Sequence, residues 1–307
     1  MQMSDIQALT TQVLWAAFFL SVVFGAIAQR THFCAMGAVS DIVNMGDWTR
    51  MRQWGMAIGV AMIGFAVLVY SGQIDPSKTL YASTRWIWLS ATVGGALFGF
   101  GMVLTSGCGS KTLIRIGGGS LKSLMVFVVM GVAAFATLKG ITAVARVDTV
   151  DQVAIDFAAG TALPDWVAAA FGIKIALAGL ILGLLLGGGL IAWALVGRDF
   201  RSLDNLLAGL GIGAVIIGMW WVSGHLGYVA EHPDTLQETF LATNSGRAEA
   251  LSFVSPAAYT LDWLMFFSDK SKVLTLGIVS VLGMVVGSAV CAIAMGNFRW
   301  EGFGSTE

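Results

Sequence analysis

Charged residues are scarce in this sequence of 307 residues. Asp, Glu, Lys and Arg together make up 11% of the chain, whereas hydrophobic residues make up 57%. A single soluble core cannot take in so many apolar side chains without leaving a large apolar exterior, which excludes an ordinary soluble globular fold. The composition predicts an all-α polytopic membrane protein surrounded by lipid.

Basic clusters are lacking as well. The 17 Lys and Arg residues are balanced by 18 Asp and Glu residues, and no segment interleaves basic with aromatic side chains, so we expect no nucleic-acid partner. The first twelve residues contain Asp5 and no Lys or Arg, unlike a cleaved signal peptide, and we expect the first apolar run to stay in the mature protein. The glycine run at 117–119 follows no strand and belongs to no nucleotide-binding motif.

Cysteine is rare, and its spacing excludes several site classes. Cys34, Cys108 and Cys291 are far apart, which matches neither a disulfide framework nor a zinc site built on paired CxxC motifs. No general base accompanies any of them in sequence, and carboxylates are missing from most apolar runs. The sequence therefore predicts no enzyme, no cofactor, no catalytic residue and no metal site.

Long apolar runs dominate what is present. We expect about seven to nine transmembrane helices, of which seven are predicted at residues 11–28, 53–71, 86–104, 120–138, 166–196, 203–222 and 272–290. The fifth run is longer than a bilayer requires, so we expect it to be tilted or broken near 187–189. Shorter pieces at 33–43 and after Cys108 cannot cross, and they are typical of re-entrant half-helices; an interfacial helix is the alternative for 33–43.

The loops differ in charge. The two long connections at 139–165 and 223–271 are mostly acidic, whereas the short connections carry most of the Lys and Arg residues. Cytoplasmic loops of membrane proteins are enriched in Lys and Arg, so we expect a periplasmic N-terminus and a cytoplasmic C-terminus.

A faint internal repeat accompanies the spans. Four apolar runs reach a short polar, small or cysteine-containing break, at residues 28–34, 105–108, 221–224 and 286–291. Transporters built from two repeats place discontinuous helices around a central site. We therefore predict one transporter domain over 1–307, with half-repeats at about 1–145 and 160–307.

The break around Cys108 is the strongest candidate site. Glycines on both sides free the backbone for close approach, and the following residues are able to open a new helix. We predict a substrate-binding and translocation site made of Cys34, Cys108, Cys291, Ser106, Gly107, Gly109, Ser110 and Lys111. The plainer interpretations are a small packing side chain for a cysteine, above all for Cys291, and a cytoplasmic surface cation for Lys111.

Several of these segments resemble the YeeE/YedE family of sulfur-compound transporters. The resemblance lies in the Cys34 segment, the Ser-Gly-Cys-Gly break at 106–109, the Ser-Phe-Val-Ser-Pro element at 252–256 and the closing segment from Cys291 to Phe303. It implies an hourglass-shaped protein of the bacterial inner membrane that takes up thiosulfate past three functional cysteines, which map to Cys34, Cys108 and Cys291. It also implies a cytosolic sulfurtransferase-like partner of the TusA type. The family often has a histidine shortly after the central cysteine, whereas this chain has Ser110-Lys111, a departure that concerns the substrate more than the fold.

The chemistry of thiosulfate agrees with thiols along its route. Carrying a bare dianion through an apolar constriction is very costly, and a neutral thiol offers a weak S–H donor on a polarizable side chain. We therefore expect Cys108 to work as a neutral donor, with backbone N–H groups at the half-helix N-termini adding positive potential. Two alternatives stay open: a thiol/disulfide oxidoreductase of the membrane, and a soft-metal or selenium transporter using His32, Cys34 and Met36.

Overall fold

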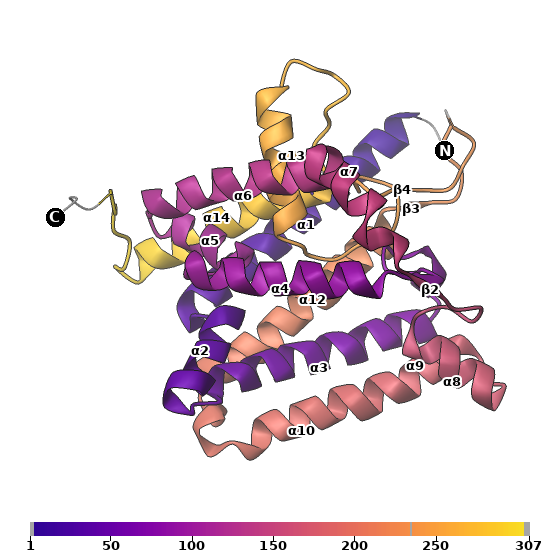
Figure 1. Cartoon of the computed structure of the whole chain (residues 1–307), viewed down its shortest axis with the longest axis horizontal. Coiled ribbons are helices and arrows are strands. Elements are labelled where there is room, and N and C mark those ends of the chain that lie inside the picture. The colour runs from indigo at the N-terminus through magenta and orange to yellow at the C-terminus, as the bar shows by residue number, and fades with distance from the viewer. Residues whose placement is uncertain (1–2, 234, 304–307) are drawn as a thin grey trace.

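The computed structural model describes residues 3–233 and 235–303, and these are largely helical (Figure 1). Seven helical segments in the described ranges are long and apolar enough to cross a membrane, which confirms the predicted all-α polytopic fold class. They are built on α1 (Met3–Thr31), α3 (Thr49–Tyr70), α4 (Trp88–Leu104), α6 (Leu121–Lys139), α9 with α10 (Ile175–Leu182 and Gly188–Val196), α11 with α12 (Leu203–Leu206 and Ile212–Trp221), and α14 (Leu276–Ala294).

Short helices and strands fill the connections. The short helices are α2 (Ala35–Met45), α5 (Gly109–Gly117), α7 (Ile141–Asp148), α8 (Leu163–Phe171) and α13 (Val254–Met265). Two antiparallel two-residue pairs join loops outside the bundle: β1 (Arg85–Trp86) with β2 (Ile155–Asp156), and β3 (Tyr228–Val229) with β4 (Thr239–Phe240). The membrane-embedded part is thus helical, and sheet pairing is confined to connecting segments among the residues described.

The centre of the bundle is the pair α1 and α14, which lie side by side (Figure 1). Small residues let the two backbones approach closely. A Cβ on Gly283 would lie 2.7 Å from the carbonyl oxygen of Phe18 and 2.8 Å from the Cβ of Ser21, so only glycine fits there. Such contacts replace the hydrophobic driving force that helices lack in lipid, because close packing gains van der Waals energy.

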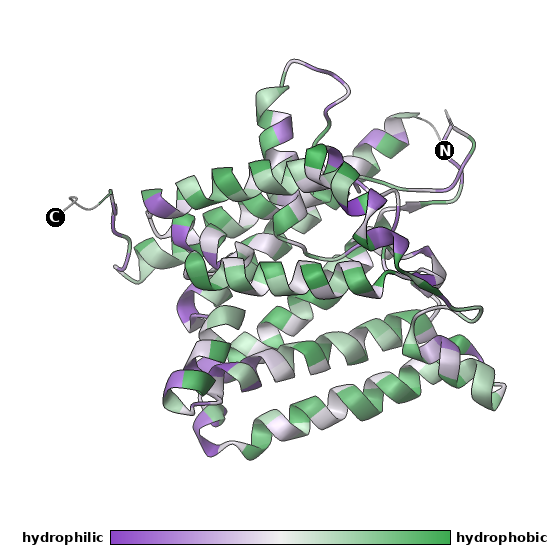
Figure 2. Ribbon diagram, in the orientation of Figure 1, coloured by the Kyte–Doolittle hydropathy of each residue, from purple (hydrophilic) through white to green (hydrophobic). Residues whose placement is uncertain are grey.

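The termini lie at opposite ends of the bundle (Figure 1). Hydrophilic segments gather at these two ends, while the helices between them are predominantly hydrophobic (Figure 2). The end that carries the C-terminus also carries the N-terminal ends of α3 and α6 and the C-terminal end of α10 (Figure 1). Most of the Lys and Arg residues in short connections therefore share one end of the molecule.

Three predicted boundaries are wrong in ways that matter for the site. Helix α14 begins four residues later than expected and continues to Ala294, so Cys291 lies inside a helix and not at a break. The predicted break at 221–224 is a π-helical continuation of α12, over Val222–Leu226. The fifth run is not broken near 187–189, because a π-helical turn at Gly183–Gly187 leads continuously into α10 through Gly188 and Gly189. Its interruption lies earlier, at Gly172, where a φ of 66° ends α8.

Candidate functional site

Cys34 occupies the break between α1 and α2. The chain leaves α1 through His32, which adopts a positive φ of 52°, and Phe33 is buried against Trp54. Cys34 then has an extended backbone and caps α2, its Sγ accepting a hydrogen bond from the amide of Gly37 at 3.3 Å. With 3% of its surface exposed, this thiol is fixed inside the protein at the N-terminus of a half-helix.

Cys108 occupies the equivalent position between α4 and α5. Ser106 has a positive φ of 54°, and Thr105 closes the turn by donating from its hydroxyl to the carbonyl of Gly107 at 2.9 Å. Cys108 has an extended backbone directly before α5, and its Sγ lies 3.1 Å from the hydroxyl of Ser110. The predicted break at Cys108 is present, and it also presents a thiol at a half-helix N-terminus.

The two thiols are neighbours. The side chains of Cys34 and Cys108 lie close enough to interact electrostatically with each other, and both cysteines are free. The amides of Ala35 and Lys111, from the first turns of α2 and α5, face the sulfur of Cys108. Helix N-termini carry partial positive charge, so the thiol pair sits where two half-helices direct N–H groups toward one point.

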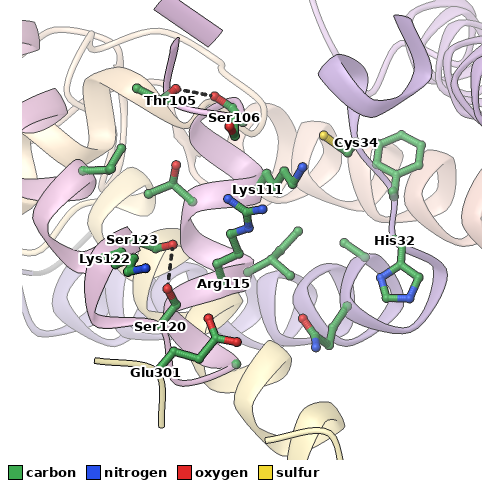
Figure 3. A pocket seen from close by; sticks show the side chains of 18 of the residues that line it. His32, Cys34, Thr105, Ser106, Lys111, Arg115, Ser120, Lys122, Ser123 and Glu301 are labelled. Carbon is green, nitrogen blue, oxygen red and sulfur yellow. Dashed lines mark hydrogen bonds between the residues drawn. The ribbon is translucent and has the colours of Figure 1, made fainter. Parts of the chain in front are cut away.

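A basic cavity of about 660 Å³ opens beside this pair. Its lining includes Cys34, Ser106 and Gly107 together with five cationic side chains, namely Arg50, Lys111, Arg115, Lys122 and Arg299. The one carboxylate among the lining residues that are described is Glu301. Figure 3 shows the amine of Lys111 extending toward Cys34, with Arg115 beside it. This excess of positive charge gives the cavity a potential that attracts anions.

Arg50 also holds the wall of the cavity. Its guanidinium pairs with the carboxylate of Asp41 at 3.2 Å, and Asp41 belongs to α2. The same guanidinium lies against Gly37, where a Cβ would come within 2.6 Å of Nη1. Arg50 therefore fixes the half-helix that carries Cys34, and part of its charge is compensated locally.

Helix α14 supports the other half-helix. The hydroxyl of Ser288 donates to the carbonyl of Ile114 at 2.6 Å and lies 3.1 Å from the side-chain oxygen of Gln29. Gly117 packs against the same place, where a Cβ would lie 2.5 Å from the Val285 carbonyl oxygen and 2.7 Å from the Cβ of Ser288. These contacts set the position of α5, and hence of Cys108, against the central helix pair.

The C-terminal segment forms part of the cavity wall. The amide of Arg299 donates to the carbonyl of Gly118 at 3.2 Å, and the amide of Glu301 donates to that of Gly119 at 3.1 Å. Gly119 has a φ of 100° and lies directly against the Arg299 carbonyl, which leaves no room for a side chain. This C-terminal segment brings Arg299 and Glu301 to the cavity from the far end of the sequence. Figure 3 shows Glu301 at the cavity wall.

The predicted site residues separate into two groups. Cys34, Ser106, Gly107 and Lys111 line the basic cavity, while Ser110 is buried with its hydroxyl at Cys108. Cys108 and Gly109 line a second, largely apolar groove, which shares Gly107 with the basic cavity. The lining of both spaces, within the part of the chain that is described, excludes Cys291.

Cys291 has a different environment. It lies in the last turns of α14, half-exposed, with its Sγ 3.5 Å from the sulfur of Met295. The structure thus brings two of the three cysteines together. Over residues 3–233 and 235–303, His, Cys, Asp and Glu side chains form no group of three or more able to hold a metal ion.

A family model and one relative match this chain over most of its length, and two further relatives match part of it. Residues 30–307 match the family described as sulphur transport. The thiosulfate transporter TsuA of Escherichia coli K12 is 24% identical over 300 residues, which cover 94% of this chain and 77% of that protein. TsuA of Spirochaeta thermophila is 27% identical over 130 residues, covering 42% of this chain and 37% of its own length. The probable transporter YedE of E. coli K12 is 29% identical over 108 residues, covering 35% and 25%.

Proposed function

The chain belongs to the sulphur transport family, and from this membership we propose that it is a permease that takes up thiosulfate or a closely related reduced-sulfur anion. The relatives that match it are named as transporters, and two of them as thiosulfate transporters. The observation that carries the proposal is the pair of neighbouring thiols beside a cavity with five cations and one carboxylate among its described lining residues.

Thiosulfate requires these features because it combines two negative charges with a soft terminal sulfur. Placing a bare dianion in a low-dielectric passage is prohibitive unless donors replace its water. The backbone N–H groups of Gly37, Ala35 and Lys111 supply fixed positive dipoles beside the thiols. Lysine and arginine side chains of the cavity supply long-range attraction without enclosing the ion.

In the proposed passage, Cys34 and Cys108 act as neighbouring stations. Each thiol is a weak donor, so it stabilises the anion without trapping it. Because the two thiols are neighbours, the ion can exchange one S–H hydrogen bond for the next. Ser110 supplies a hydroxyl at the second station. Cys291 is proposed as a third station on α14, separate from the pair.

The proposed orientation in the membrane rests on the charge distribution. The cations of the cavity gather with the short basic connections at the end that holds the C-terminus. The excess of Lys and Arg in cytoplasmic loops favours placing this end in the cytoplasm and the N-terminus in the periplasm of an inner-membrane protein. The ion then leaves through the basic cavity, where a cytosolic sulfurtransferase-like protein of the TusA type would receive it beside the exposed Trp300.

Transport by purified protein tests the proposal. We expect proteoliposomes containing the chain to accumulate labelled thiosulfate, and unlabelled thiosulfate to compete far better than sulfate, because sulfate has the same charge and lacks the soft sulfur. Empty liposomes and proteoliposomes kept on ice are the controls. Equal competition by sulfate, or no uptake by folded protein, would contradict it.

A further inference from the structure

Helix α4 stands apart from the rest of the bundle, with none of its residues buried. Between α4 and α6 lies an apolar groove of about 490 Å³. Its walls include Phe98, Gly101 and Met102 of α4 and Val126, Val129 and Ala133 of α6. Cys108 lines this groove as well, so the break between α4 and α5 has a largely apolar side next to the exposed helix α4.

Such a groove is unsuited to the transported anion. The groove has no charged side chain among its described lining residues, and the hydroxyls of Thr105 and Thr112 already donate to backbone carbonyls. The thiol of Cys108 is a weak donor, so a dianion along the rest of the groove would lose its hydration without compensation. An occupant that covers Cys108 on this side has to be apolar where it touches α4 and α6.

A cation lies one helical turn beyond one end of the groove, at the basic cavity. Lys122 lies one helical turn before Val126 on the same face of α6, and Lys122 and Val126 both line the basic cavity. From Lys122 to Ala133 a helix advances roughly 16 Å, which is close to one leaflet of a hydrocarbon core about 30 Å thick. An amphiphile with an anionic head and one leaflet-long chain fits both the charge and the length.

We propose that a membrane phospholipid occupies this groove, with its phosphate at Lys122 and an acyl chain along Val126, Val129 and Ala133. The bound chain closes the space between α4 and α6 and separates Cys108 from the bulk bilayer. It thereby forms part of the wall around Cys108. The occupant is a lipid of the leaflet on the basic side of the protein, in exchange with its neighbours.

Photocrosslinking in nanodiscs tests this site. A phospholipid carrying a diazirine in its acyl chain is expected to label the groove-lining peptides of α4 and α6 more strongly than the reference surface. The reference surface is the exposed face of α10 and of the turn before it, where Leu185 has 67% of its surface exposed. Lys122→Met is expected to weaken labelling in the groove about fivefold, the equivalent of ~1 kcal/mol for one lysine at a phosphate.

Gly101→Leu provides the filling variant. A side chain at Gly101 has open space in the groove, since a Cβ there meets no atom within 4 Å, so the protein is expected to fold while labelling of the groove falls. Gly189→Leu on α10 is the matched control, because Gly189 also faces open space and lies outside this groove. Equal labelling of the groove and the α10 face, or labelling unaffected by Gly101→Leu, would each overturn the proposal.

Discussion

Replacing Lys111 with methionine removes a cation from the route while keeping an unbranched apolar stem. In the structure, the amine of Lys111 extends toward Cys34 (Figure 3), and its methylene groups lie over Gly107. Within the described residues it makes no ion pair with a carboxylate, so its charge is available to a substrate. The substitution therefore tests electrostatic attraction separately from the thiols.

The expected effect is moderate. A unit charge about 8 Å from a dianion contributes about 1 to 2 kcal/mol in a hydrated cavity of high effective dielectric, which corresponds to a roughly 5- to 30-fold increase in KM. Because the cavity is open to solvent, added salt screens the same interaction, so wild-type transport is expected to lose more affinity with ionic strength than the variant.

Initial rates of thiosulfate uptake into proteoliposomes, measured against substrate and salt concentration, give both quantities. Lys174→Met is the matched control, since Lys174 lies directly before α9 at the opposite end of the bundle (Figure 1). A Lys111→Met protein with the wild-type KM and the wild-type salt dependence would refute the role given to the basic cavity.

Three further predictions concern the supports of the site and the stability of the fold. Gly117→Ala places a Cβ against α14 and is expected to lower the free energy of unfolding by about 1–3 kcal/mol, so that the melting temperature falls and uptake is abolished. Gly118→Ala is the control: a Cβ there would have its nearest neighbour at 3.4 Å, and neither effect is expected. Glu301→Gln removes the carboxylate of the cavity and is expected to lower KM by about two- to fivefold in an uptake assay at low salt, where an unchanged or higher KM would count against the anionic substrate. Burial raises the pKa of Glu249, so the folded protein keeps the proton of this carboxyl at pH values where the unfolded chain has lost it. Thermal stability should therefore fall as pH rises above about 4.3, the ordinary pKa of glutamate. Glu249→Gln should weaken this pH dependence in melting curves.

The spans can be predicted from sequence because an apolar run of bilayer length is typical of a helix that crosses a membrane. Both breaks that hold the thiol pair can be predicted as well, since polar residues at 29–32 and glycines around Cys108 interrupt apolar runs. The proximity of the two thiols cannot be predicted, because nothing in the order of residues indicates that α2 and α5 direct their N-termini to one point.

The position of Cys291 shows where the apolar pattern misleads. Hydropathy favours a start of the last span at about residue 272, but the chain folds back through a turn there, and the helix begins only at Leu276. The helix then continues past Cys291 to Ala294, through alanine-rich sequence that favours its continuation.

The residues that form the cavity wall are the hardest to predict from the sequence. Arg50, Arg299 and Glu301 come from separate regions of the chain and converge only through tertiary structure. The positive-inside bias predicts that Arg50 and Arg299 lie on one side of the membrane. The attachment of Arg299 and Glu301 to the cavity depends on backbone hydrogen bonds to Gly118 and Gly119, and such bonds leave no signal in local composition.

The thiol pair is tested most directly by thiosulfate uptake in Cys34→Ala and Cys108→Ala proteins reconstituted at equal amounts. Ser280→Ala is the control. It removes a small buried polar group away from the thiol pair, in α14, and so reports the effect of losing packing and a hydrogen bond. We predict that both cysteine variants insert, melt cooperatively and lose transport, while Ser280→Ala retains it. Full thiosulfate uptake by both cysteine variants would contradict the passage of the anion along Cys34 and Cys108.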